Sequence, residues 1–149
     1  MVAKASGITF EDYVHSHILA PLGMNDSTLL HKAADPALLT SPHVGKDDPA
    51  PWTFFPYNRR HAPSSTLLSS AHDMARWIAA NLNRGELDGV RILKASSYDT
   101  LWGPFAEQGS GMGLSWCLGE FKGHRTVAPG GSDTGYKSHR TLYPDDGLG

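Results

Sequence analysis

Cysteine, long apolar runs and an excess of positive charge are scarce or missing in this 149-residue sequence. Its single cysteine, Cys117, excludes an internal disulfide and any zinc site built from several cysteines. No run of about 18 apolar residues occurs, so the sequence predicts no membrane-spanning helix. Lys and Arg number 13 against 15 Asp and Glu, giving a net charge of -2. This balance argues against nucleic-acid binding, which usually needs a basic excess.

The compact signatures of a serine nucleophile are also absent. No lysine follows a serine at the Ser-x-x-Lys spacing, which would place an amine one helical turn from the hydroxyl. Gly-x-Ser-x-Gly does not occur either. Because a serine hydroxyl is a poor nucleophile until a base takes its proton, the chain carries no self-contained nucleophile signature. Eight histidines occur without a His-Glu-x-x-His pattern, and we expect neither a metal nor a cofactor.

Two segments of the sequence show helical periodicity. Apolar residues at helical spacing predict a helix over residues 9–19, with Thr9 as its N-cap. A stronger apolar stripe predicts a helix over residues 71–83. Ser70 and Asp73 resemble the capping box that opens such a helix, so we interpret both as caps.

The region between these helices is irregular. Six prolines interrupt residues 31–68, and each removes a backbone donor. We expect an excursion with short strand pieces around residues 52–55, and a further short helix over residues 96–102. Aromatic side chains in the excursion either line a substrate cleft or are simply buried: Trp52, Phe54, Phe55 and Tyr57.

The last part of the chain changes to a strand pattern. Residues 113–118 alternate with period two, and we expect Cys117 to be a buried, inert thiol there. The alternation places three apolar residues on one face, namely Leu114, Trp116 and Leu118. Further strands are predicted at 125–128 and 136–143, separated by a glycine-rich turn at 129–135, and residues 144–149 read as another turn. Helices followed by antiparallel strands indicate an α+β fold.

The glycine-rich segment leaves two weaker interpretations open. Asp133-Thr134-Gly135 matches the aspartic-protease tripeptide, which needs a second carboxylate and would require a homodimer. The backbone amides of residues 130–135 also suit a phosphate, but the lysine of a P-loop is missing and no helix begins there. A plain turn explains the segment more simply.

Four segments in order resemble one family, the serine β-lactamase-like hydrolases. This family includes class C β-lactamases, penicillin-binding-protein-like peptidases and related esterases. The similar segments are residues 7–28 with Pro21-Leu22-Gly23-Met24, residues 61–77, residues 111–116 and residues 130–144. Their order and spacing extend over nearly the whole chain, so the resemblance implies a partial β-lactamase/transpeptidase-like fold over residues 1–149.

The resemblance also assigns candidate site residues. The family's third catalytic motif, usually Lys-Thr-Gly or His-x-Gly, falls on Pro129, Gly130 and Gly131. The backbone amide of Ser132 matches the family's second oxyanion-hole donor. Gly130, Gly131, Ser132 and Tyr136 are the expected substrate-binding residues. Proline supplies no side-chain donor, so the resemblance is incomplete at Pro129.

The same resemblance implies that parts of the reaction centre lie elsewhere. In the family, Ser-x-x-Lys and Tyr-x-Asn precede the first similar segment, and a further strand and helix follow the last one. We therefore expect a fragment of a hydrolase that cleaves a small-molecule ester, a β-lactam or a peptide through a serine acyl-enzyme, inactive by itself. The alternative is a non-catalytic ligand-binding module that uses a groove near residues 129–136.

One expectation concerns behaviour in solution. A sheet cut before its last strand leaves unpaired edges, which predicts self-association or poor solubility.

The first residues carry no signal peptide. The compartment of the parent stays open among periplasmic, secreted and cytoplasmic.

Overall fold

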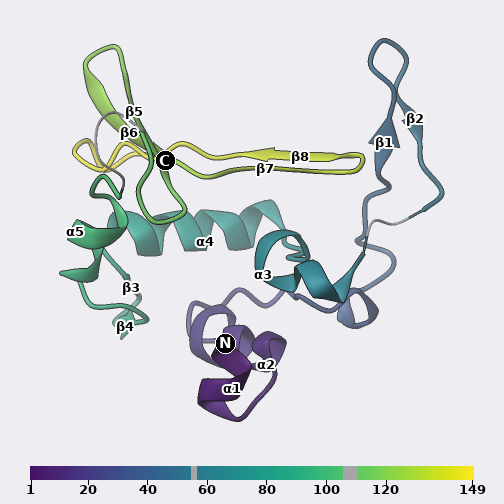
Figure 1. Cartoon of the computed structure of the whole chain (residues 1–149), viewed down its shortest axis with the longest axis horizontal. Coiled ribbons are helices and arrows are strands. Elements are labelled where there is room, and N and C mark those ends of the chain that lie inside the picture. Colours follow the sequence, from purple (N-terminus) through teal and green to yellow (C-terminus); the bar gives the residue numbers. More distant parts are fainter. Residues whose placement is uncertain (55–56, 106–110) are drawn as a thin grey trace. The chain divides into compact units, whose positions relative to one another are not determined.

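The computed structural model describes residues 1–54, 57–105 and 111–149 (Figure 1). The chain divides into two units, one of Met1–Asp73 with Gly131–Ser138 and one of Met74–Gly130 with His139–Gly149. The α-helices are α1 (Val2–Ser6), α2 (Phe10–Val14), α3 (Ala62–Ser65), α4 (Ala71–Leu82) and α5 (Ser97–Leu101). The strands are β1 (His43–Val44), β2 (Ala50–Pro51), β3 (Glu86–Leu87), β4 (Val90–Arg91), β5 (Cys117–Phe121), β6 (His124–Ala128), β7 (Gly130–Asp133) and β8 (Tyr136–His139).

The helix predicted over residues 9–19 is confirmed, but its second half is π-helical instead of α-helical. Thr9 caps α2, since its Oγ1 accepts the Asp12 amide at 3.1 Å. The helix then continues as a π-helical turn, His15–Leu19. The turn that follows is buried, with Leu22 and Met24 almost fully enclosed. This part of the sequence therefore serves packing.

The start of α4 is stabilised by a local cap and by a tertiary contact. Ser70 is confirmed as a cap because its Oγ accepts the Asp73 amide at 3.1 Å. The Asp73 carboxylate has a tertiary role instead of a local one. Its Oδ2 accepts the Asp26 amide at 2.8 Å and the Ser27 hydroxyl at 2.7 Å, and the residue is 1% exposed. A buried carboxylate thus fixes residues 26 and 27 to Asp73 within the first unit.

The described residues of the proline-rich excursion form short elements. β1 and β2 pair antiparallel, with His43 opposite Pro51. The strand piece expected at 52–55 lies slightly earlier, and Phe55 falls outside the described residues. Additional 3-10 turns occur at His31–Ala33 and Arg59–His61. Proline limits these pieces because it cannot donate to a ladder.

An ion pair in the first unit should make its stability depend on acid. Glu11 is buried, and its carboxylate accepts Arg59 Nε at 2.6 Å and Nη2 at 3.2 Å. The hydrogen bond from Arg59 lowers the pKa of Glu11 below the ordinary value of 4.5. A lowered folded-state pKa gives stability above pH 4.5 that is lost as the pH falls through the folded pKa. Melting curves across that range should show this loss for the native chain and a smaller one for Glu11→Gln.

The matched control is Glu120→Gln, at an exposed position on β5. This variant should follow the native pH profile. Equal acid sensitivity in the native chain and in Glu11→Gln would contradict the assignment. Arg59 is 64% exposed, so solvent screening keeps the effect modest.

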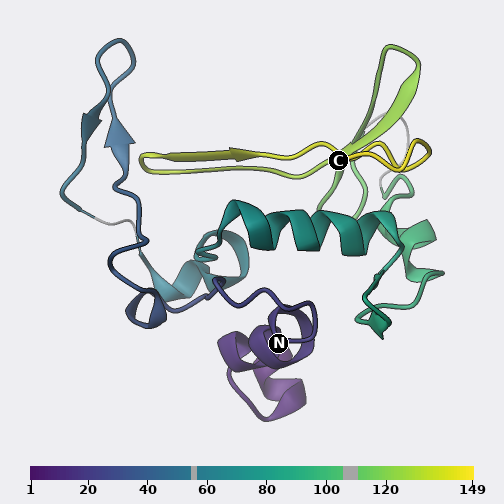
Figure 2. The ribbon, with the colours of Figure 1, turned by 180° about the vertical axis from the view of Figure 1, so that it is seen from behind.

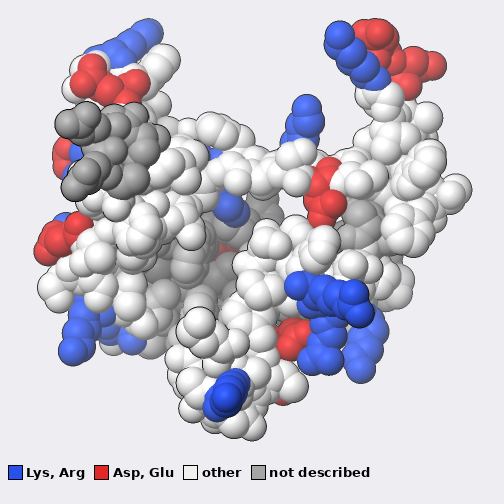
Figure 3. All heavy atoms as spheres, viewed as in Figure 1, with Lys and Arg blue, Asp and Glu red and all other residues white. Residues whose placement is uncertain are grey.

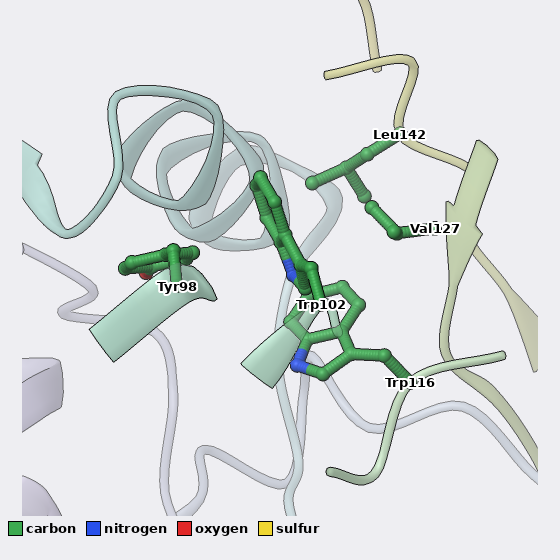
Figure 4. Close-up of a cluster of buried hydrophobic side chains, with 5 residues drawn as sticks. All are labelled: Tyr98, Trp102, Trp116, Val127 and Leu142. Carbon is green, nitrogen blue, oxygen red and sulfur yellow. The ribbon is translucent and has the colours of Figure 1, made fainter. Parts of the chain in front are cut away.

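An aromatic cluster forms the core of the second unit (Figure 4). Its buried members are Tyr98, Trp102, Trp116, Val127 and Leu142. The Trp102 ring meets Tyr98 edge-on at 4.8 Å between centroids and Trp116 at 6.0 Å. The Tyr98 hydroxyl donates to Asn81 Oδ1 at 3.0 Å, and burial raises the pKa of Tyr98. The helix predicted at 96–102 is therefore confirmed as α5, which carries Tyr98 and Leu101 to this core.

The strand predicted at residues 113–118 is wrong. Ser115 adopts a left-handed φ of 64°, and the Gly113 amide donates to the Trp116 carbonyl at 2.7 Å, so the chain turns there. The strand β5 begins only at Cys117 and pairs with β6, which confirms the strand predicted at 125–128. Cys117 is exposed, so the expectation of a buried thiol is also wrong. Trp116 is buried all the same, because the turn directs it into the core.

The glycine-rich segment is a hairpin rather than the predicted turn. β7 and β8 run side by side in both views, joined by a tight turn at residues 134 and 135 (Figures 1 and 2). β8 is shorter than the strand predicted at 136–143. Leu142 forms a separate bridge with Val127, through two hydrogen bonds of 2.9 Å. The final turn is confirmed by the Tyr143 amide, which donates to the Leu148 carbonyl at 2.8 Å.

Candidate active site

Strand β7 carries most of the residues that the sequence assigned to a site. Pro129 precedes the strand and is half-buried, whereas Gly130, Gly131 and Ser132 are exposed. A Cβ atom at Gly131 would lie 2.9 Å from the Ser138 Oγ on β8. Because glycine has no side chain, the backbone of this strand is open to close approach. The strand therefore presents main-chain groups more than side chains.

Tyr136 begins β8 and is half-buried. Its hydroxyl donates to the Thr40 carbonyl at 2.6 Å. The neighbouring Gly135 carbonyl accepts the His43 amide at 3.1 Å. The sequence did not indicate these partners, which lie over ninety positions earlier in the chain. Substrate contact by Tyr136 stays a prediction, with the hydroxyl oriented toward Thr40.

Asp133 has a local role in the hairpin turn. Its Oδ1 accepts the amide of the next residue, Thr134, at 2.7 Å, where the chain enters the turn at residues 134 and 135. This geometry supports the turn interpretation of Asp133-Thr134-Gly135. Among the residues that the structure describes, no group of three or more His, Cys, Asp or Glu side chains is arranged to hold a metal ion.

The aromatic residues of the excursion differ in exposure. Trp52 is 48% and Phe54 65% exposed, so both present apolar surface to solvent. Tyr57 is half-buried, and its hydroxyl donates to the Leu29 carbonyl at 3.4 Å. A role for these rings in lining a substrate cleft stays a prediction.

A groove of about 490 Å³ lies in the first unit, away from β7. It is lined by Thr9, Glu11, Asp12, Leu30, His31, Lys32, Tyr57 and Arg59. The Glu11–Arg59 pair forms part of its wall. Sequence reasoning missed this groove because its walls come from three separate segments.

Two further observations concern the charged side chains and the hydropathy of the helices. On the face shown in Figure 3, basic and acidic side chains lie in scattered groups and form no continuous basic stripe. Ion pairs in the second unit include Arg76 with Asp88 and Arg125 with Asp145. Among the described residues, no helix is both long and apolar enough to cross a membrane.

Comparison with known proteins decides the family. The family described as Beta-lactamase matches residues 1–149. The chain belongs to the Beta-lactamase family. A similar curated protein is penicillin-binding protein 4 of Amycolatopsis lactamdurans, 27% identical over 165 residues, with 99% of this chain and 42% of that protein covered. The resemblance of the four sequence segments is thereby confirmed.

Solved structures agree on the fold of this Beta-lactamase family chain. An octameric penicillin-binding protein homologue from Pyrococcus abyssi gives a TM-score of 0.77 at 22% identity, covering 97% of this chain and 33% of the other. A β-lactamase/D-alanine carboxypeptidase from Pseudomonas syringae gives 0.76 at 17% identity, covering 98% and 48%. A class C β-lactamase gives 0.75 at 17% identity, covering 97% and 46%. The α+β, β-lactamase-like fold is thus confirmed, and the chain spans less than half the length of these relatives.

Proposed function

We propose that the chain supplies the third-motif hairpin of a serine hydrolase that acts on an ester, a β-lactam or a peptide, with its nucleophile outside these 149 residues. The main support for this proposal is β7, a strand with exposed Gly130, Gly131 and Ser132 in a chain of the Beta-lactamase family. The absence of Ser-x-x-Lys and Tyr-x-Asn from the sequence supports the second part of the proposal.

The proposed chemistry assigns β7 a main-chain role. When a serine attacks a carbonyl, negative charge develops on the carbonyl oxygen. An amide aimed at that oxygen is worth about 2.7–4 kcal/mol in a complete site. The Ser132 amide is the proposed donor, and Gly130 and Gly131 allow the substrate backbone to approach the strand. Pro129 provides neither charge nor a hydrogen bond from its side chain, so the proposal gives it no chemical step.

The isolated chain should not form an acyl-enzyme. The folded chain, incubated with nitrocefin and with p-nitrophenyl acetate, is expected to hydrolyse both no faster than the urea-unfolded chain does after correction for buffer. Intact-mass measurement should show no adduct, because no serine has a lysine one helical turn away. A stoichiometric adduct on a serine of the folded chain would overturn this proposal.

A second candidate is a non-catalytic binding module, favoured by the exposure of Gly131 and Ser132 on β7. Calorimetric titration of the same sample with benzylpenicillin distinguishes the two. Saturable binding without hydrolysis supports the module. Heat at the level of dilution supports an inactive part of a hydrolase.

We also propose that the chain self-associates. Exposed apolar side chains support this, including Phe121 at 55% and Leu148 at 63% exposure. The Pyrococcus abyssi homologue, which is described as octameric, gives a precedent in the same fold. Sedimentation velocity of the purified chain measures the state directly.

A further inference from the structure

The tip of the β7–β8 hairpin is fastened to a distant part of the first unit. The Tyr136 hydroxyl donates to the Thr40 carbonyl at 2.6 Å, across 96 positions of sequence. Next to it, the His43 amide donates to the Gly135 carbonyl at 3.1 Å. All four residues belong to the same unit, so this geometry is an internal property of it.

Gly135 shows how closely the two segments meet. Its φ is +77°, which L side chains adopt only with strain. A Cβ atom there would also lie 2.5 Å from the Pro42 Cβ and 2.8 Å from the His43 amide nitrogen. The turn therefore needs glycine for two separate reasons, its own conformation and its contact with Pro42.

The segment that receives the hairpin is itself anchored. The Trp52 amide donates to the Pro42 carbonyl at 2.7 Å. Beside it, β1 pairs with β2. Residues 42–44 are thus bonded to residues 50–52, so the segment that receives the hairpin belongs to a second short hairpin.

A two-stranded hairpin needs such support. An isolated hairpin is marginally stable in water, and in the part of the chain that the structure describes β7 and β8 form a two-stranded sheet with mostly exposed residues. Hydrogen bonds at the tip restrict the motion of both strands. Positioning of site groups to within about 0.5 Å generally depends on such supporting contacts.

We propose that Thr40, Pro42, His43, Gly135 and Tyr136 form a latch that fixes the β7–β8 hairpin, with Tyr136 as a positioning residue. The consequence for the reaction, a fixed Ser132 amide, rests on the proposed function. The latch is tested without substrate, so its failure and the failure of the hydrolase proposal are separate results.

The first test compares two glycines that both adopt a positive φ, so that alanine is strained at either position. Gly135→Ala combines a positive φ with the collision against Pro42. Gly123→Ala has a φ of +84° in the β5–β6 turn, with nothing within 4 Å of the added Cβ. Amide hydrogen exchange of residues 131–138 should accelerate at least about tenfold in Gly135→Ala and stay native in Gly123→Ala. Native exchange in both variants would overturn the latch.

The second test removes only a hydroxyl, so it holds even if Gly135→Ala fails to fold. Tyr136→Phe should accelerate exchange of residues 131–138, the Ser132 amide included, by about fivefold, the value of one ordinary hydrogen bond. The carbonyl ¹³C resonance of Thr40 should move as it loses its donor, a signature that ring packing alone does not produce.

Tyr57→Phe is the matched control, because it loses a longer bond of 3.4 Å to the Leu29 carbonyl. It should leave the Thr40 resonance and the hairpin exchange unchanged. An unchanged Thr40 resonance in Tyr136→Phe, or hairpin exchange equal to that of Tyr57→Phe, would overturn the positioning role of Tyr136.

Discussion

Replacing Trp102 by alanine is expected to lower the free energy of unfolding of the second unit by about 4 kcal/mol. Trp102 is 5% exposed and lies between Tyr98 and Trp116 in the aromatic cluster. Alanine would leave a cavity that neighbouring rings fill only in part. Urea denaturation followed by near-ultraviolet circular dichroism measures the loss, since this signal reports fixed aromatic packing.

Two variants separate packing from other effects of losing Trp102. Trp102→Phe keeps an aromatic ring and removes Nε1, a buried nitrogen that has no hydrogen-bond partner among the described residues. Its cost should be less than half that of alanine, because the removed group contributes no bond. Trp52→Ala removes a tryptophan that is 48% exposed and should cost well under about 1 kcal/mol. Equal losses for Trp102→Ala and Trp52→Ala would contradict the proposed core.

Replacing Asp73 by alanine is expected to cost about 3 kcal/mol in the first unit. The Asp73 carboxylate is buried and accepts hydrogen bonds from the Asp26 amide and the Ser27 hydroxyl. Its removal takes away the acceptor of the Asp26 amide and leaves the buried Ser27 hydroxyl with Ser69 Oγ, 2.7 Å away, as its remaining partner. Thermal and urea unfolding of the purified variant measure the effect.

The controls for Asp73 use related carboxylates. Asp73→Asn keeps one acceptor oxygen and should recover part of the loss. Asp35→Ala removes an exposed carboxylate that accepts the Ala37 amide at 2.9 Å, and should cost less than about 1 kcal/mol. The tertiary role of Asp73 would be refuted by a loss in Asp73→Ala no larger than that in Asp35→Ala.

Local signals explain what could be predicted about the fold. The helices α2 and α4 depend on apolar spacing and on caps within a few residues, Thr9 and Ser70. The same locality explains the confirmed strand β6 and the final turn. These contacts form between neighbours in sequence, so a window of the sequence contains the interactions that decide them.

Alternation alone misled the prediction at residues 113–118. A period of two does not reveal a left-handed residue, and Ser115 turns the chain where a strand was expected. Cys117 is consequently exposed at the start of β5. The hairpin at residues 130–139 was missed for a related reason, since glycine has low strand propensity and only pairing with β8 makes β7 a strand.

The sequence by itself determined the family resemblance, the α+β class and the helices with local caps, and it predicted a candidate motif at residues 129–132. Only the tertiary structure decided what the Asp73 carboxylate binds, where Cys117 lies and which backbone the Tyr136 hydroxyl meets. The physical reason is the separation in sequence between the residues that interact. Caps and periodicity are satisfied within one or two turns of chain, whereas a hydrogen bond from Tyr136 to Thr40 exists only after folding brings residues 96 positions apart together.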